Sequence, residues 1–236
     1  MRSLLFGTLL FTVACTGVET SHGSQTLHVD AYAEAHRARL DVSGTDAWDT
    51  ELTVILAKEG QPAHGGQVEI TTSAGTILLD EVEAGTYLGT QRGYGEEHGH
   101  VAWFELNVRN GDDFVNGVQL AGPQLSTLLS PARDAIQLAG QPLEVRWSPS
   151  GDARAELQTT RMGARAVDDN GAFDVPVEDM NAMTVHNARV ANPPELLRLI
   201  RSRSTAIAGA AEGSRFSVRV ENDLQFTVVP SSQQAR

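Results

Sequence analysis

Apolar and polar residues alternate along most of this chain with the period of two that is typical of β-strands. In the segment 101–109, Ala102, Phe104, Leu106 and Val108 fall on one face, and mostly polar residues fall between them. Shorter segments of β character, bounded by turn-forming residues, are 52–56, 68–72, 76–79, 85–88, 114–120, 143–147, 155–159 and 172–176. Antiparallel sheets with one dry and one wet face require this pattern, so we predict an all-β fold of the sandwich type.

Three further stretches complete the predicted strands. Residues 27–42 combine helix-forming residues with alternating apolar ones, and we expect two strands joined by a turn. Residues 196–207 are expected to form one strand. Residues 216–220 and 224–229 are expected to form a closing hairpin around Asn222 and Asp223, since asparagine and aspartate favour turns.

The segment 123–131, which begins and ends with proline, is the predicted boundary between two domains. We predict a first β-sandwich over residues 27–122, this linker over 123–131, a second β-sandwich over 132–230 and a polar tail over 231–236. Each sandwich is long enough to bury a core of its own, so we expect the two to fold independently.

Two groups of residues resemble known modules. The Gly60-Gln61-Pro62 turn, the Val68-Glu69-Ile70 strand and the Gly85-Thr86-Tyr87 strand start resemble bacterial immunoglobulin-like and carboxypeptidase-regulatory-like modules. The segment 143–147, which ends in Trp147 before a proline- and glycine-containing turn, is similar to the early strands of fibronectin-type sandwiches. The resemblance implies two tandem immunoglobulin-like β-sandwiches, and it implies no particular activity.

The N-terminus has the layout of an export signal. Arg2 precedes an apolar stretch too short to span a membrane, and the stretch ends at Cys15, the only cysteine of the chain. Ala14 followed by Cys15 resembles the lipobox of bacterial lipoproteins, which implies a signal peptide over residues 1–14, a lipid on the Cys15 sulfur and a tether over 15–26. Thr16, which is not aspartate, implies sorting to the outer membrane. The alternative is an ordinary signal peptide that leaves a soluble periplasmic protein.

The charge of the chain excludes one class of partner. The net charge is −12, and residues 16–123 carry 17 acidic against 5 basic residues, whereas residues 124–236 carry 13 against 12. Nucleic acid requires a basic footprint, so we predict no nucleic-acid partner. A positively charged partner, a divalent cation and simple solubility remain open.

The best candidate for metal chemistry is the segment 96–100. On an extended chain His98 and His100 point to the same side, and Glu96 or His64 could complete a zinc or copper site. The alternative is a solvated polar loop, in which the intervening glycine loosens the backbone. We expect no structural metal at this segment.

Two acidic turns and one group of arginines are the remaining candidates. Asp112 with Asp113, and Asp168 with Asp169, could offer oxygen ligands to calcium, although such residues also favour turns without any ion. Arg198, Arg201 and Arg203 could form an anion-binding patch. On a strand, Arg201 and Arg203 share one face and Arg198 lies on the other, and we expect all three to pair with acidic residues.

No sequence signature of catalysis stands out. The chain has no Gly-x-Ser-x-Gly element, no Ser-x-x-Lys element, no phosphate-binding loop and no dinucleotide fingerprint. We therefore predict a non-catalytic cell-envelope lipoprotein, held at the outer membrane by lipid, that binds or supports a protein or glycan partner without a cofactor. The alternatives are a metal-binding envelope protein that uses His98 and His100 and, as a third class, a hydrolase.

Overall fold

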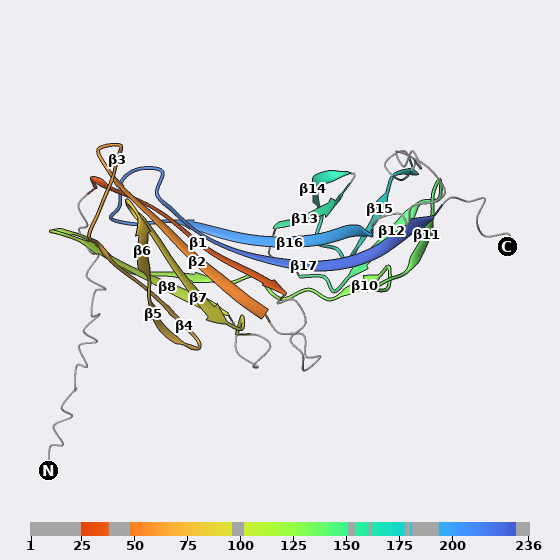
Figure 1. The fold of residues 1–236 in the computed structure, drawn as a ribbon, viewed down its shortest axis with the longest axis horizontal. Coiled ribbons are helices and arrows are strands. Elements are labelled where there is room, and N and C mark those ends of the chain that lie inside the picture. The colour runs from red at the N-terminus through yellow and green to blue at the C-terminus, as the bar shows by residue number, and fades with distance from the viewer. Residues whose placement is uncertain are drawn as a thin grey trace, which may run out of the picture.

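A computed structural model describes residues 25–37, 48–95, 102–150, 154–160, 162–177, 180 and 194–229. The described residues form an all-β structure of 17 strands in three sheets, which confirms the predicted fold class. One sheet of ten strands runs the length of the molecule, and two smaller sheets pack against its two halves (Figure 1). We call the long one the central sheet.

The central sheet brings the first strand of the chain beside the last one. Its strands, in spatial order, are β14 (Gly163–Val167), β13 (Arg154–Thr159), β16 (Glu195–Ala206), β17 (Arg215–Val229), β1 (Leu27–Arg37), β2 (Trp48–Lys58), β7 (Thr86–Arg92) and β6 (Asp80–Glu83), with β3 (Gln61–Pro62) beside β2 and β11 (Ile136–Leu138) beside β17. The β1–β17 pair is parallel and runs from Asp30 opposite Arg215 to His36 opposite Glu221. Parallel pairing of these two strands means that the sheet is complete only when the C-terminal strand is in place.

The first sandwich packs a four-stranded sheet on the N-terminal half of the central sheet. That sheet has the order β5 (Gly75–Leu78), β4 (Gln67–Thr72), β8 (Trp103–Asn110) and β9 (Asp113–Ala121). Strand β8 buries Phe104, Leu106 and Val108 as predicted, each no more than 2% exposed. They meet Leu52 and Leu56 of β2 in one apolar core, and each such side chain contributes about 1.5–3 kcal/mol on burial.

The second sandwich packs a three-stranded sheet on the other half. Its strands are β10 (Leu128–Ser130), β12 (Leu143–Trp147) and β15 (Ala172–Val175), in that spatial order. Trp147 is 1% exposed and points into the core, as the alternation over 143–147 predicts. Leu157, Leu199 and Phe226 of the central sheet lie in the same core.

Strand β17 belongs to both sandwiches. Phe216, Val218 and Val220 lie in the first core, and Phe226 and Val228 further along the same strand lie in the second. The predicted second domain over 132–230 therefore contributes part of the core of the first. This arrangement favours cooperative folding of the two predicted halves.

The predicted hairpin around Asn222 and Asp223 is wrong, because β17 passes through both residues without turning. The inward positions alternate without a break from Phe216 to Val228, and Asn222 occupies one of them at 3% exposure. Its side-chain amide donates to the Ser126 carbonyl oxygen. Tertiary packing thus satisfies an asparagine that local turn chemistry favours for a reversal.

The prediction of two strands in residues 27–42 is also wrong over the part that the structure describes. Residues 27–37 form the single strand β1, in which Ala31, Ala33 and Ala35 are completely buried. The helix-forming composition of this segment is overridden, because small alternating residues fit between β2 and β17 in the sheet.

The structure explains why glycine and tyrosine occur in the Gly85-Thr86-Tyr87 strand start. Glycine is required at position 85, where φ is +68° and a Cβ atom would lie 2.5 Å from the Leu56 carbonyl oxygen. The Tyr87 ring is buried, and its hydroxyl accepts a hydrogen bond from the Gly66 amide at 2.7 Å. The motif therefore closes one end of the first sandwich.

Candidate functional site

Four of the sequence-predicted site residues lie outside the described residues. They are the lipidation candidate Cys15 and the metal candidates Glu96, His98 and His100. Their predicted roles stay predictions. His64 is described, and its Nδ1 lies 3.4 Å from Glu81 Oε1 at an exposed position. Glu81 Oε2 also accepts from the Gly65 amide at 3.0 Å, and Oε1 accepts from the Gly85 amide at 3.1 Å.

The acidic turn at Asp112 and Asp113 is tied to the only lysine of the chain. Asp113 is 4% exposed, and its Oδ2 accepts a hydrogen bond from Lys58 Nζ at 2.7 Å. This hydrogen bond and the adjacent negative charge raise the pKa of Lys58 above its usual range. Since an ammonium group already occupies the Asp113 carboxylate, we do not propose this turn as a calcium site.

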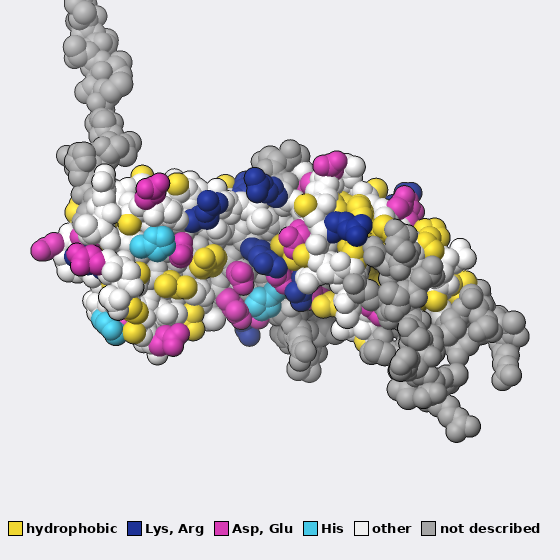
Figure 2. Space-filling model, turned by 90° about the horizontal axis from the view of Figure 1, so that it is seen from above, with side chains coloured by type: hydrophobic (Ala, Val, Ile, Leu, Met, Phe, Trp, Pro, Cys, Tyr) yellow, Lys and Arg dark blue, Asp and Glu magenta, His cyan; other side chains and the backbone are white. Residues whose placement is uncertain are grey.

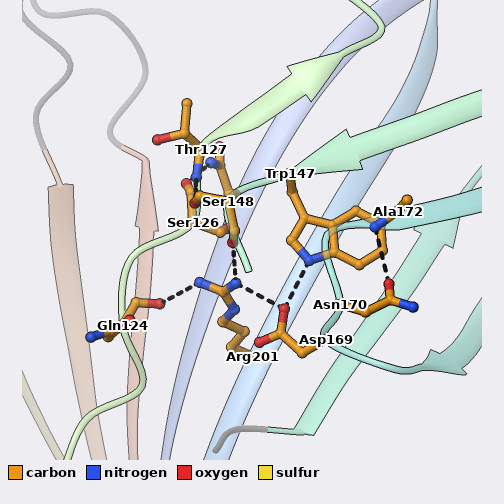
Figure 3. A network of polar contacts seen from close by, with 10 residues as sticks. Gln124, Ser126, Thr127, Trp147, Ser148, Asp169, Asn170, Ala172 and Arg201 are labelled. Carbon is orange, nitrogen blue, oxygen red and sulfur yellow. Dashed lines mark hydrogen bonds and ion pairs between the residues drawn. The ribbon is translucent and has the colours of Figure 1, made fainter. Parts of the chain in front are cut away.

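Asp169 of the second acidic turn accepts hydrogen bonds from two side chains (Figure 3). Its Oδ1 accepts from Trp147 Nε1 at 2.8 Å and from the Arg201 guanidinium at 2.9 Å. Asn170 beside it forms a local turn, because its side-chain oxygen accepts from the Ala172 amide at 3.1 Å. The carboxylate of Asp169 is thus used by an indole and a guanidinium, and we do not propose calcium there.

Arg201 joins three segments at the junction of the two sandwiches. Besides Asp169, its guanidinium donates to the Gln124 carbonyl oxygen at 3.1 Å and to the Ser148 carbonyl oxygen at 2.5 Å. Thr127 and Ser148 add two hydrogen bonds between the linker and the end of β12, at 2.8 and 2.9 Å (Figure 3). The predicted linker is therefore held by a buried guanidinium, and it is not a free hinge.

The predicted face assignment of the three arginines is confirmed. Arg201 points inward at the junction, and Arg203 on the same face donates to the Gly122 carbonyl oxygen at 3.2 Å. Arg198 lies on the opposite face, where its Nε is 3.2 Å from Glu221 Oε2 and 3.1 Å from Asp223 Oδ1. Pairing with acidic residues was the correct expectation for Arg198 and Arg201.

The outer face of the central sheet points away from both smaller sheets. Charged side chains of both signs gather over its middle (Figure 2). A small apolar group lies on the same face over β1, β2 and β7, where Tyr32, Ile55 and Leu88 are 37%, 42% and 42% exposed. This face extends over both sandwiches without interruption, because β17 is one continuous strand that belongs to both.

One hollow on this face is acidic. It has a volume of about 390 Å³ and is lined by four carboxylate residues together with a histidine and two arginines: Glu34, Asp49, Glu221, Asp223, His36, Arg37 and Arg198. Part of its negative charge is compensated by the Arg198 contacts described above. Among the residues that the structure describes, no group of three or more histidine, cysteine, aspartate or glutamate side chains could hold a metal ion.

A second hollow on the same sheet is basic, and sequence reasoning missed it. It is lined by three arginines, three serines and one leucine: Arg154, Arg203, Arg215, Ser202, Ser204, Ser217 and Leu120. These residues come from β9, β13, β16 and β17, which are distant in sequence. We call it the arginine–serine groove. The alternation of serine and arginine over 202–204 is the only local signal of it in the sequence.

Within the described ranges, no helix combines the length and the apolar character needed to cross a lipid bilayer.

No protein-family model and no curated protein sequence matches this chain. Several solved structures are similar to it at low sequence identity and low TM-score. Fibronectin(III)-like modules of Clostridium thermocellum CbhA are 11% identical over 89% of this chain and 97% of theirs, with a TM-score of 0.25. A 1.5-MDa bacterial ice-binding adhesin is 11% identical over 88% of this chain and 67% of that chain, with a TM-score of 0.26. A chimeric titin Z1Z2 tandem is 10% identical, covers 84% and 96%, and has a TM-score of 0.23.

Proposed function

We propose that this chain is a non-catalytic cell-envelope lipoprotein whose body is a stiff binding or structural module for a protein or glycan partner. The observation that carries the proposal is that β17 contributes side chains to the cores of both sandwiches. Two domains joined by a flexible linker reorient freely, whereas two cores that share a strand move as one body.

The junction contacts support the same function. Arg201 and Asn222 bond to backbone oxygens of residues 124–126, so the segment between the sandwiches is fixed at two points. The outer face of the central sheet then presents one continuous surface with a constant shape. A surface of this kind suits recognition or spacing, because a preorganised binding face loses less conformational entropy on association.

In this proposal, a lipid on Cys15 anchors the two-sandwich body to a membrane of the cell envelope. A single acyl chain holds a protein only marginally, so stable retention requires the several chains of a lipoprotein anchor. The outer membrane is the proposed location, on the basis of Thr16 after the lipidated residue.

Fractionation and in-cell crosslinking test the proposal together. We expect the wild type, grown with labelled palmitate, to carry the label and sediment with membranes, and the Cys15→Ala variant to be unlabelled and soluble. A photo-crosslinking residue in place of Ile55, on the outer face, should give a discrete adduct, and the same residue in place of exposed Leu129 serves as the matched control. Soluble, unlabelled wild type, or equal adducts at both positions, would contradict the proposal.

A further inference from the structure

The arginine–serine groove has a volume of about 450 Å³, and no carboxylate is among the described residues that line it. This is unusual in a chain of net charge −12. Arg154 lies opposite Ser202 across the β13–β16 pair, and Ser204 lies opposite Ser217 across the β16–β17 pair. The serine hydroxyls therefore form the middle of the groove, between arginines of different strands.

Arg154 and Arg215 bring positive charge to the groove. By register, Asp30 on β1 lies opposite Arg215, but Asp30 Oδ2 is 3.1 Å from His28 Nε2. The Arg215 guanidinium is directed to the other side, where it donates to Ser204 Oγ at 3.1 Å. Arg203 also lines the groove, and its guanidinium donates to the Gly122 carbonyl oxygen. Arg154 is exposed.

These residue types match two parts of one ligand. A guanidinium binds phosphate or carboxylate oxygens through paired N–H donors, and a serine hydroxyl both donates to and accepts from the hydroxyl groups of a sugar. We propose that the arginine–serine groove binds a sugar that carries one oxyanion, a phosphate or a carboxylate. This inference rests on the proposed function, and it names the class of glycan that the module recognises.

The surroundings of the groove select a small anion over a polyanion. The acidic hollow with Glu34 and Glu221 lies on the outer face of the central sheet, to which the three serines of the groove also point. On this face Glu34 is opposite Arg219 and Glu221 is opposite Ile200. A polymer of regularly spaced negative charges that extended along this face would meet those carboxylates, and like charges repel. A volume of about 450 Å³ is suitable for one or two sugar units.

Titration of the purified body, observed through the arginine Nε–Hε signals in NMR spectra, tests the inference with four probes: glucose 6-phosphate, glucuronate, glucose and inorganic phosphate. We expect saturable shifts with one or both charged sugars and none with glucose, and the preferred charged sugar identifies the oxyanion. The variant with Arg154→Gln and Arg215→Gln should bind at least about tenfold more weakly, since each lost charge-assisted bond is worth about that factor. Arg146→Gln, on the three-stranded sheet, is the matched control and should bind like the wild type.

Three results would overturn the inference. They are no saturation with either charged sugar below about 10 mM, undiminished binding by the double variant, and binding of inorganic phosphate as tight as that of the sugar phosphate. Membrane anchoring is a separate readout, because it depends on Cys15 and the groove variants leave it intact. Failure of the groove therefore differs from failure of the proposed function.

Discussion

The Arg201 guanidinium and the Asp169 carboxylate form a 2.9 Å ion pair whose side chains are only 1% and 5% exposed. The pair lies at the junction of the two sandwiches, and it connects β16 to the turn that precedes β15 (Figure 3). Burial of two charges is costly, so each depends on its partner. We therefore expect the junction to be sensitive to the loss of either charged group.

Replacement of Arg201 with methionine should lower the free energy of unfolding by about 3–5 kcal/mol, because Asp169 then remains buried without its cation. Urea unfolding followed by tryptophan fluorescence measures this loss, since the Trp147 indole bonds to Asp169. Addition of Asp169→Asn to Arg201→Met should recover part of the loss.

The matched control is Arg146→Ala. Arg146 pairs with Glu144 at 2.5 Å, but the two side chains are 59% and 50% exposed. Exposed pairs of this kind contribute at most about 1 kcal/mol. Equal destabilisation by Arg201→Met and Arg146→Ala would show that burial of the junction pair has no energetic consequence.

Two phenylalanines of β17 report whether the sandwiches unfold together. Phe216 lies in the first core and Phe226 in the second, and both are no more than 1% exposed. Either Phe→Ala variant should lose about 3–5 kcal/mol. Because the strand is shared, we expect each variant to shift the unfolding transitions of both cores equally.

Trp48 in the first core and Trp147 in the second provide the two readouts, each in a variant whose other tryptophans are replaced by phenylalanine. Coincident midpoints in the parent and in both Phe→Ala variants are expected of a single cooperative unit. A Trp147 transition that stays in place while Phe216→Ala moves the Trp48 transition would mean that the sandwiches unfold independently.

Acid should weaken the first sandwich through Glu81. Hydrogen bonds from the Gly65 and Gly85 amides hold the pKa of Glu81 below its usual 4.5. A lowered folded-state pKa means that this stability is complete above pH 4.5 and is lost as the pH falls through the folded-state value. Urea midpoints measured between about pH 7 and about pH 3 should fall more steeply in the wild type than in Glu81→Gln.

The control for this effect is Glu83→Gln, at an exposed position of the same strand. We expect its pH profile to follow that of the wild type. A Glu81→Gln profile as steep as the wild-type profile would exclude the two amide bonds as the source of the acid sensitivity.

Simultaneous replacement of His98 and His100 with alanine should leave the melting temperature unchanged, with zinc, with copper or with EDTA. The glycine between the two histidines makes a rigid metal site costly. Binding of an ion to the native state alone, at a hundredfold above its dissociation constant, would add about 2.7 kcal/mol. A rise of several degrees with one metal, abolished by the double substitution, would instead favour a metal-binding envelope protein.

Local alternation predicted individual strands well. The segments 143–147 and 155–159 are strands β12 and β13, and the inward position of Trp147 follows from a period of two alone. The predictions that failed depended on turns. Asn222 and Asp223 have the composition of a turn, but the carbonyl oxygen of Ser126 and the guanidinium of Arg198 satisfy them within a continuous strand.

The candidate site was less predictable than the strands. Arg201 and Arg203 were assigned to the correct face from their spacing, but the partners of Arg201 come from three other segments. The arginine–serine groove combines Arg154 with Arg215, which are 61 positions apart in the sequence. No periodicity relates such residues, because their proximity comes from the pairing of β13 with β16 and of β16 with β17.

The sequence by itself determined the all-β class and the inward face of most strands, because the alternation of apolar and polar residues acts over a few neighbouring positions. Only the tertiary structure decided that Phe216 and Phe226 of one strand lie in two cores, and that β1 pairs in parallel with β17. The physical reason is that the free energy of a sheet depends on which edges and faces meet, and chain segments almost 200 positions apart meet only after folding.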